Sequence, residues 1–223
     1  MMHSFQNDGY AILHPILTSS MCEQISSSLT QMSKKGIGSR SLLEMPWCTE
    51  LAQTIRRHPA IAPFLPVDAV AVQCTFFEKS RDQNWLVPIH QDLSIPVKEK
   101  LVNPALTGWS EKQGSVFVQP PDWVLQELVA VRLHVDECGN DDGALRIVPG
   151  SHRLGRLSNE DALKARSNLG EVVCAVAKGG ALLLKPLVLH ASSKATGQSR
   201  RRVLHLVFGP IALPLGLRWQ HAV

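Results

Sequence analysis

Residues 69–77 read Ala-Val-Ala-Val-Gln-Cys-Thr-Phe-Phe, a run of small apolar, β-branched and aromatic residues that predicts a β-strand. The same texture returns further along the chain, in Leu128–Asp136, Ala144–Val148, Val172–Ala177, Ala181–Leu189 and Val203–Phe208. Gly179-Gly180 separates two of these runs and predicts a hairpin turn between them. The region from residue 67 onward is therefore expected to consist mainly of β-strands.

Helical spacing marks the region before these strands. A first helix is predicted from apolar residues one turn apart, ending at Gly36, and a second over Glu50–Arg57. A later helix is expected between the Ser158 capping box and Gly170. Two helices followed by about seven strands predict a mainly β fold, a double-stranded β-helix (jelly roll, cupin-like) with N-terminal helices packed on one sheet.

One domain is predicted over residues 1–223, with a helical N-terminal support at 1–66 and a jelly-roll core at 67–209. Within the support, Phe5–Tyr10 predicts a turn that leads into a short strand at 11–13. Residues 94–124 hold several prolines and two tryptophans without periodicity. Such a segment is expected to be a lid-like insertion or, alternatively, a surface excursion that covers a barrel edge.

The composition describes an ordinary soluble globular protein, with 44% hydrophobic residues and a formal net charge of +4. With 5% aromatic residues and no basic stripe interleaved with them, nucleic-acid binding is not expected. No apolar stretch approaches the roughly 20 residues that span a membrane, so no membrane association is expected either. The expected partner is a small-molecule substrate, and the expected state is a monomer or a homodimer.

The five cysteines are widely spaced and form no Cys-x-x-Cys pair, so neither a zinc knuckle nor a dithiol redox site is indicated. Cys74 and Cys174 lie in apolar runs and are expected to be reduced core residues. Reduced cysteines favour the cytoplasm, and the N-terminus shows no signal-peptide pattern.

His90 and Asp92 form the first candidate metal-binding pair. In an extended chain, residues two apart point to the same side, so the imidazole and the carboxylate face one point in space. His190, after the apolar run 182–189, is the candidate third ligand. Two histidines and one carboxylate form a facial triad that suits Fe(II) with open positions, although zinc also accepts this set.

Arg201 follows His190 by eleven positions, at the start of the last predicted strand. If that strand pairs antiparallel with the strand of His190, Arg201 reaches into the same barrel. A buried guanidinium beside a metal site requires a planar carboxylate partner, such as the free end of a dicarboxylate that chelates iron. The alternative is a surface basic cluster of Arg200, Arg201 and Arg202, with the register among the three left open.

At this point the chain resembles the phytanoyl-CoA dioxygenase family of Fe(II)- and 2-oxoglutarate-dependent oxygenases. Four stretches in this order carry the resemblance: Phe5–Tyr10, Asn84–Asp92, Asp142–His152 and His190–Ser193 followed by Arg201. The resemblance implies that His90, Asp92 and His190 bind Fe(II) and are the catalytic centre. It also implies that Arg201 and Ser192 bind the distal carboxylate of 2-oxoglutarate, with Gln73 as a further contact, and that O₂ is the second co-substrate.

By the same resemblance, the predicted reaction is hydroxylation of an unactivated carbon, with release of succinate and CO₂. Halogenating relatives replace the ligand carboxylate by a small residue, so Asp92 favours hydroxylation. Candidate substrate contacts are Trp85, Arg132, His134, Arg146 and His205. Inward cationic groups among them suggest an anionic substrate, while a structural ion pair with Asp136 or Glu137 is the alternative. The rival functions are a zinc-dependent hydrolase or isomerase on the same fold and a non-catalytic ligand-binding jelly roll.

Overall fold

The computed structural model describes residues 2–32, 40, 42–197 and 199–223. The predicted helix end at Gly36 lies outside the described residues. The α-helices are α1 (Met2–Asp8), α2 (Ser19–Met32), α3 (Pro46–Arg57), α4 (Asp122–Gln126) and α5 (Asn159–Leu169). Short 3-10 turns cover Leu42–Glu44, Ala62–Phe64, Asn140–Asp142 and Ser151–Leu154. Of the helices formed by the described residues, none combines the length and apolar character needed to cross a bilayer.

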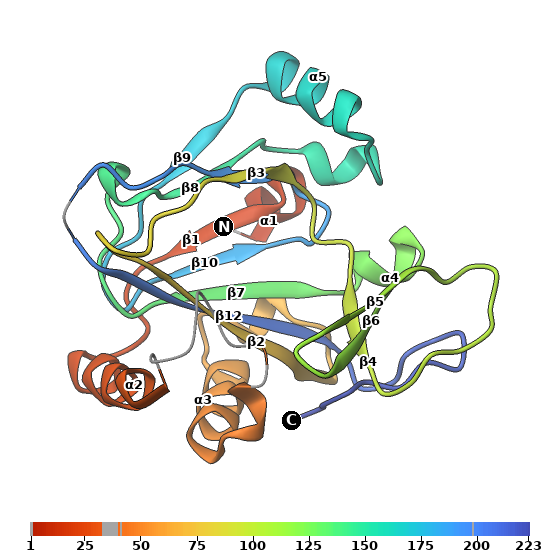
Figure 1. Cartoon of the computed structure of the whole chain (residues 1–223), viewed down its shortest axis with the longest axis horizontal. Helices are drawn as coiled ribbons and strands as arrows, with labels where there is room; N and C mark the ends of the chain where they lie inside the picture. The colour runs from red at the N-terminus through yellow and green to blue at the C-terminus, as the bar shows by residue number, and fades with distance from the viewer. Residues whose placement is uncertain (1, 33–39, 41, 198) are drawn as a thin grey trace.

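Two antiparallel sheets face each other and form a jelly roll, which confirms the predicted fold class. The five-stranded sheet has the order β1-β10-β7-β12-β2, with β1 (Tyr10–Leu13), β10 (Ala181–Leu184), β7 (Val129–His134), β12 (Arg201–Pro210) and β2 (Ala69–Lys79). The four-stranded sheet has the order β3-β11-β8-β9, with β3 (Val87–His90), β11 (His190–Ser192), β8 (Leu145–Ile147) and β9 (Val172–Cys174). Figure 1 shows the smaller sheet above the larger one.

Helices α2 and α3 cover the outer face of the five-stranded sheet, as predicted (Figure 1). Their buried residues, such as Ile25 and Ile55, share one apolar cluster with outward-facing strand residues, such as Leu204 and Phe208. Each fully buried side chain of this size contributes about 1.5–3 kcal/mol through removal from water. Helix α3 begins at Pro46, four positions before the predicted start at Glu50, because Pro at the first helical position is already constrained to helical φ.

The inner face of the same sheet carries polar side chains. Strand β12 alternates strictly, with Leu204 and Leu206 in the outer apolar cluster and Arg201 and His205 facing the other sheet. The register of β12 against β2 shifts between Val207 and Phe208, so β2 has one extra residue there. The sheet therefore directs a row of charged and polar groups into the barrel.

Two predictions about strand connections are wrong. Gly179-Gly180 does not join a hairpin, because β9 pairs with β8 in the smaller sheet while β10 lies between β1 and β7 in the larger one. The predicted strand Ala181–Leu189 ends at Leu184, and the chain then crosses to the other sheet, where β11 begins at His190. The break falls at Lys185-Pro186, where a half-buried lysine and a proline interrupt an otherwise buried apolar run.

Of three local predictions, one holds and two differ in detail. Phe5 lies in helix α1 rather than in a turn, although the predicted short strand follows as β1. Ser158 caps α5 as predicted, since its hydroxyl accepts from the backbone N–H of Asp161. Residues 94–124 are mostly ordered into β4 (Ile95–Val97), β5 (Thr107–Lys112), β6 (Ser115–Gln119) and the start of α4. Strands β4, β6 and β5 form a separate three-stranded sheet at one end of the barrel (Figure 1).

Candidate active site

The candidate metal ligands come from the facing ends of two paired strands. His90 ends β3, His190 begins β11, and the two residues are directly opposite each other in the antiparallel ladder. Asp92 lies two residues beyond His90, and its carboxylate oxygens are 3.9 Å from His90 Nε2 and 3.8 Å from His190 Nε2. One ligand atom from each of the three residues lies within 4.8 Å of the others, which is a spacing that a single cation can bridge.

Backbone carbonyls set the orientation of both imidazole rings. His90 Nδ1 lies 2.8 Å from the carbonyl oxygen of Pro88, and His190 Nδ1 lies 2.9 Å from that of Val188. A carbonyl only accepts, so each Nδ1 carries the proton and each Nε2 presents its lone pair toward Asp92. Burial lowers the pKa of His190 to about 4, which keeps this ring neutral at pH 7. This is the protonation state that a metal ligand requires, so the donor set fits a divalent cation such as Fe(II).

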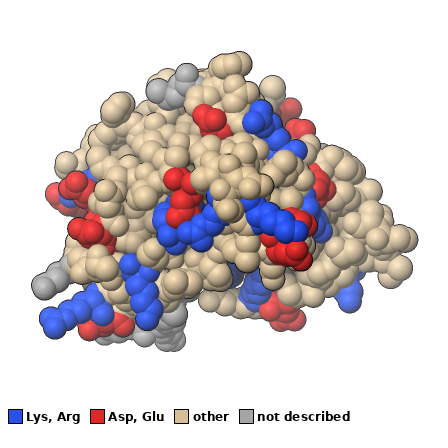
Figure 2. Space-filling model, turned by 90° about the horizontal axis from the view of Figure 1, so that it is seen from above, with Lys and Arg blue, Asp and Glu red and all other residues tan. Residues whose placement is uncertain are grey.

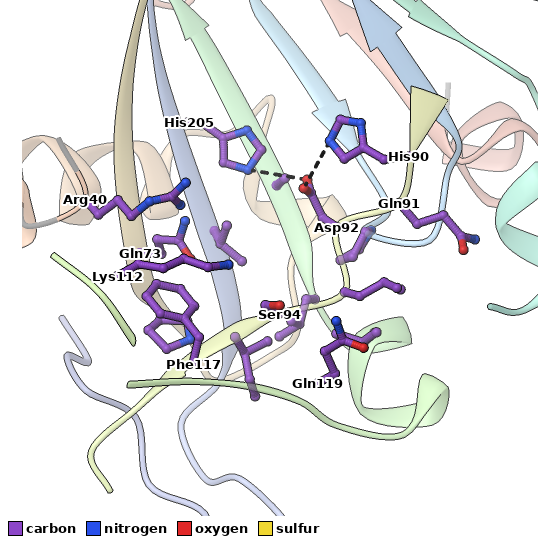
Figure 3. A pocket seen from close by; sticks show the side chains of 18 residues that line it. Arg40, Gln73, His90, Gln91, Asp92, Ser94, Lys112, Phe117, Gln119 and His205 are labelled. Carbon is purple, nitrogen blue, oxygen red and sulfur yellow. Dashed lines mark ion pairs between the residues drawn. The ribbon is translucent and has the colours of Figure 1, made fainter. Parts of the chain in front are cut away.

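A third histidine, His205, faces the same carboxylate from the opposite sheet. Its Nε2 lies 3.9 Å from Asp92 (Figure 3), and its Nδ1 lies 3.0 Å from a guanidinium nitrogen of Arg132. A guanidinium only donates, so Nδ1 accepts and the proton of the neutral ring is on Nε2. Burial and Arg132 lower the pKa of His205 to about 3, which keeps it neutral. His205 therefore presents an N–H to Asp92, whereas His90 and His190 present lone pairs.

A second polar group lies further along the barrel, around Arg201 on β12 and Lys79 on β2. These two residues are directly paired in the sheet, and both side chains are buried. Lys79 Nζ donates to Ser192 Oγ at 2.9 Å and to the carbonyl of Ser193. Arg201 donates to the carbonyl of Gly143, and its Nε has no hydrogen-bond partner among the described residues. Among the same residues, neither cation forms an ion pair.

The structure distinguishes the three consecutive arginines. Arg200 pairs with Glu78 and Arg202 with Asp136, both outside the barrel, while Arg201 points inward. The route by which Arg201 reaches the site differs from the prediction. Strand β12 pairs with β2 and β7, not with the strand of His190, so Arg201 approaches from across the barrel. It reaches the carbonyl of Gly143, just before β8 of the smaller sheet, because the two sheets oppose each other.

A cavity of about 330 Å³ opens beside the triad, and His90, Asp92, His205 and Gln73 all line it. Gln73 also donates to Thr75 at 2.9 Å, so the two residues share the inner face of β2. Figure 3 shows the labelled polar side chains arranged around this space. The cavity is near the lower end of the usual size range for small-molecule sites.

Four of the five predicted substrate contacts lie elsewhere. Only His205 lines the cavity. The ammonium group of Lys79 lies over the ring of Trp85, 5.6 Å from its centroid. Arg146 forms an ion pair with Glu171, with 3.0 Å between the charged atoms. The other two are buried on β7, where Arg132 contacts His205 and His134 has no hydrogen-bond partner among the described residues. The alternative is an ion pair with Asp136 or Glu137; Asp136 pairs with Arg202 instead, and no ion pair of Arg132 or His134 with either residue forms among the described residues.

Sequence reasoning missed three cationic residues near the cavity and the co-substrate end. Lys79 extends the inward alternation of Thr75 and Phe77 by two positions, so a longer strand prediction would have found it. Arg40 and Lys112 line the cavity, but they come from segments far apart in the sequence. No local pattern brings them together.

Similarity to known proteins is found with one sequence family and with solved structures. The sequence model of the phytanoyl-CoA dioxygenase family (PhyH) matches residues 5–203. No curated protein matches the chain by sequence. Among solved structures, EctD from S. alaskensis is similar with a TM-score of 0.71 and 16% identity, covering 94% of this chain and 76% of that one.

Two further solved structures show the same fold. The non-heme alpha ketoglutarate dependent carbocyclase SnoK from nogalamycin biosynthesis has a TM-score of 0.70 and 12% identity, over 94% of this chain and 82% of its own. HygX from Streptomyces hygroscopicus, solved with nickel and 2-oxoglutarate bound, has a TM-score of 0.65 and 18% identity, covering 94% of this chain and 85% of that one.

Proposed function

Because the chain belongs to the phytanoyl-CoA dioxygenase family and is a 2-oxoglutarate-dependent oxygenase, we propose that it hydroxylates an unactivated carbon of a small anionic substrate. The overall reaction converts substrate, O₂ and 2-oxoglutarate to hydroxylated substrate, succinate and CO₂. When bound, Fe(II) and 2-oxoglutarate supply the oxidising chemistry, and the protein supplies binding, orientation and exclusion of water. Asp92 provides the ligand carboxylate that supports hydroxylation rather than halogenation.

His90, Asp92 and His190 are the proposed iron ligands. The observation that supports them is the pair of Nδ1–carbonyl contacts, which point both Nε2 lone pairs at one carboxylate. His205 presents an N–H to Asp92 and is proposed to orient the carboxylate rather than to bind the metal.

Arg201, Ser192 and Lys79 are the proposed contacts of the distal carboxylate of 2-oxoglutarate. The single observation that carries this assignment is the buried pair of Lys79 and Arg201, two cations that face no carboxylate among the described residues. A buried unpaired charge is costly, so this end of the barrel is built to receive an anion. A zinc-dependent hydrolase with the same triad has no need for these two cations. Gln73 lies on the cavity side of the triad, which places it better for a substrate contact than for this carboxylate.

An anaerobic titration tests the proposal. Adding Fe(II) and then 2-oxoglutarate to the metal-free protein is expected to produce a visible metal-to-ligand charge-transfer band. His90→Ala is expected to abolish the band and bound iron, while His152→Ala, whose ring contacts the carbonyl of Gln6 away from the triad, retains both. If no band appears and His90→Ala leaves the metal content unchanged, the iron site is refuted, and a zinc enzyme or a non-catalytic binding protein becomes the better reading.

Two properties remain predictions. The five cysteines are all free and buried, which supports the proposed reducing compartment, the cytoplasm. On the face shown in Figure 2, Lys and Arg side chains lie next to Asp and Glu, as on an ordinary solvated surface. We therefore retain a small molecule as the proposed partner and expect binding neither to nucleic acid nor to a membrane. The proposed oligomeric state is a monomer or a homodimer.

A further inference from the structure

Two cations and one aromatic ring form a wall of the substrate cavity, away from the metal ligands. Arg40 and Lys112 both line the cavity, and each lies over the ring of Phe117, at 5.9 Å and 5.0 Å from its centroid. Figure 3 shows the two side chains extending in the same direction, toward the part of the cavity where Asp92 and His205 lie. The backbone N–H of Arg40 donates to the side-chain oxygen of Gln113 at 2.9 Å, which attaches this residue to the β5–β6 turn.

These two cations lack a protein counter-ion. Among the described residues that line the cavity, Asp92 is the only acidic one, and it belongs to the metal centre. Neither Arg40 nor Lys112 forms an ion pair with any part of the chain that the structure describes. Burial lowers the pKa of Lys112 and the nearby charge of Arg40 lowers it further, while the more weakly acting Asp92 raises it, so the repulsion between the two like charges is only partly offset. A bound anion would relieve this repulsion.

We propose that Lys112 and Arg40 together bind the anionic group of the substrate, a carboxylate or a similarly compact anion. This inference rests on the proposed oxygenase function and adds the substrate class and its orientation. The anion is held at the Phe117 wall, while the carbon to be oxidised faces the triad on the other side of the cavity. The substrate therefore carries its reacting carbon several bonds away from its charge. Gln73, on the inner face of β2, lies beside Arg40 and Lys112 in Figure 3 and offers a neutral hydrogen-bonding group to the same end of the substrate.

Paired ligands test this inference directly. The protein is loaded with Ni(II) and saturating 2-oxoglutarate, so that no turnover occurs and the co-substrate site is filled. Small carboxylic acids and their primary amides, which match in shape but differ in charge, are then compared by ligand-observed saturation-transfer NMR and by thermal shift. We expect acids to bind more tightly than their amides, and Lys112→Gln or Arg40→Gln to weaken acid binding by about 10- to 150-fold, as for a hydrogen bond to a charged group.

Lys100→Gln is the matched control, because Lys100 also lies over an aromatic ring, that of Trp109 at 5.9 Å, but is exposed and does not line the cavity. It should bind acids as the unaltered protein does. Lys112→Glu should reverse the preference toward amines.

Acids that bind no better than their amides, including a panel in which neither binds, overturn the inference. An acid preference that survives in both Lys112→Gln and Arg40→Gln also overturns it. Failure of the oxygenase function itself is recognised separately, since the Fe(II)–2-oxoglutarate absorption band is recorded without any substrate. If the absorption band is normal but acids bind no better than amides, the proposed anion binding by Lys112 and Arg40 is rejected and the oxygenase function is not.

Discussion

Replacing Lys79 by methionine should make the protein more stable and its co-substrate binding weaker. Methionine keeps the length and apolar contacts of the side chain and removes only the ammonium group. In the metal-free protein, Lys79 is buried beside Arg201, and its hydrogen-bond acceptors among the described residues are the oxygens of Ser192 and Ser193. Its charge therefore lowers the free energy of unfolding until an anion is bound.

The expected magnitude follows from the pKa of Lys79, which burial and the neighbouring Arg201 lower from 10.5 to about 8. At pH 7 the amine is charged in both the folded and the unfolded state, so the full cost of about 3 kcal/mol is present. That cost falls as the pH rises from about 8 toward the unfolded value. Because Lys79→Met also loses the hydrogen bonds to Ser192 and Ser193, we expect a net stabilisation of about 1–3 kcal/mol.

Affinity for 2-oxoglutarate should change in the opposite direction. A hydrogen bond to a charged group contributes about 1.5–3 kcal/mol, so Lys79→Met should raise the Kd about 10- to 150-fold. Urea unfolding of the metal-free protein measures the stability, and anaerobic titration of the Fe(II) protein with 2-oxoglutarate measures the Kd. Lys185→Met is the control, because Lys185 is a partly buried lysine that donates to the carbonyl of Gln126, away from the triad.

The reasoning is refuted if Lys79→Met is less stable than the unaltered protein and binds 2-oxoglutarate with the same Kd. That outcome would make Lys79 a structural residue that fastens β2 to the segment of Ser192 and Ser193.

Three further outcomes are expected. Gly143→Ala should lower the free energy of unfolding by about 1–3 kcal/mol in urea titrations. Gly143 has φ +66°, and an added Cβ would lie 2.7 Å from the carbonyl oxygen of Ser193. Gly170→Ala is the control: Gly170 has φ +73° but open space around it, so this change should lower the free energy of unfolding less. His205→Ala should weaken iron binding about 10- to 100-fold in chelator competition, because the ligand carboxylate loses its neighbouring N–H. Affinity for 2-oxoglutarate should be constant below about pH 8 and fall above it, since a bound dianion favours the protonated form of Lys79. In Lys79→Met, the affinities titrated at about pH 7 and about pH 9 should be equal.

The sequence alone determined the features that depend on local order. Alternation and β-branched texture indicated the long strands, β2 and β12, within about two residues of their observed ends. The two-residue spacing of His90 and Asp92 predicted that both side chains lie on one side of an extended chain. In the structure, His90 Nε2 lies 3.9 Å from Asp92 Oδ1. These inferences needed only the geometry of a few consecutive residues.

Only the tertiary structure decided which sheet each strand joins. The run 181–189 is compatible with one long strand, yet it holds β10, a crossing at Lys185-Pro186 and the approach to β11, because all its residues except the half-buried Lys185 are buried in the sheets or between them. The same pairing of strands put Arg201 in the sheet opposite that of His190 and put Lys79 directly beside Arg201. It also brought Arg40 and Lys112 to one wall of the cavity. Contacts between distant segments depend on the packing of whole sheets, and no short stretch of sequence encodes that packing.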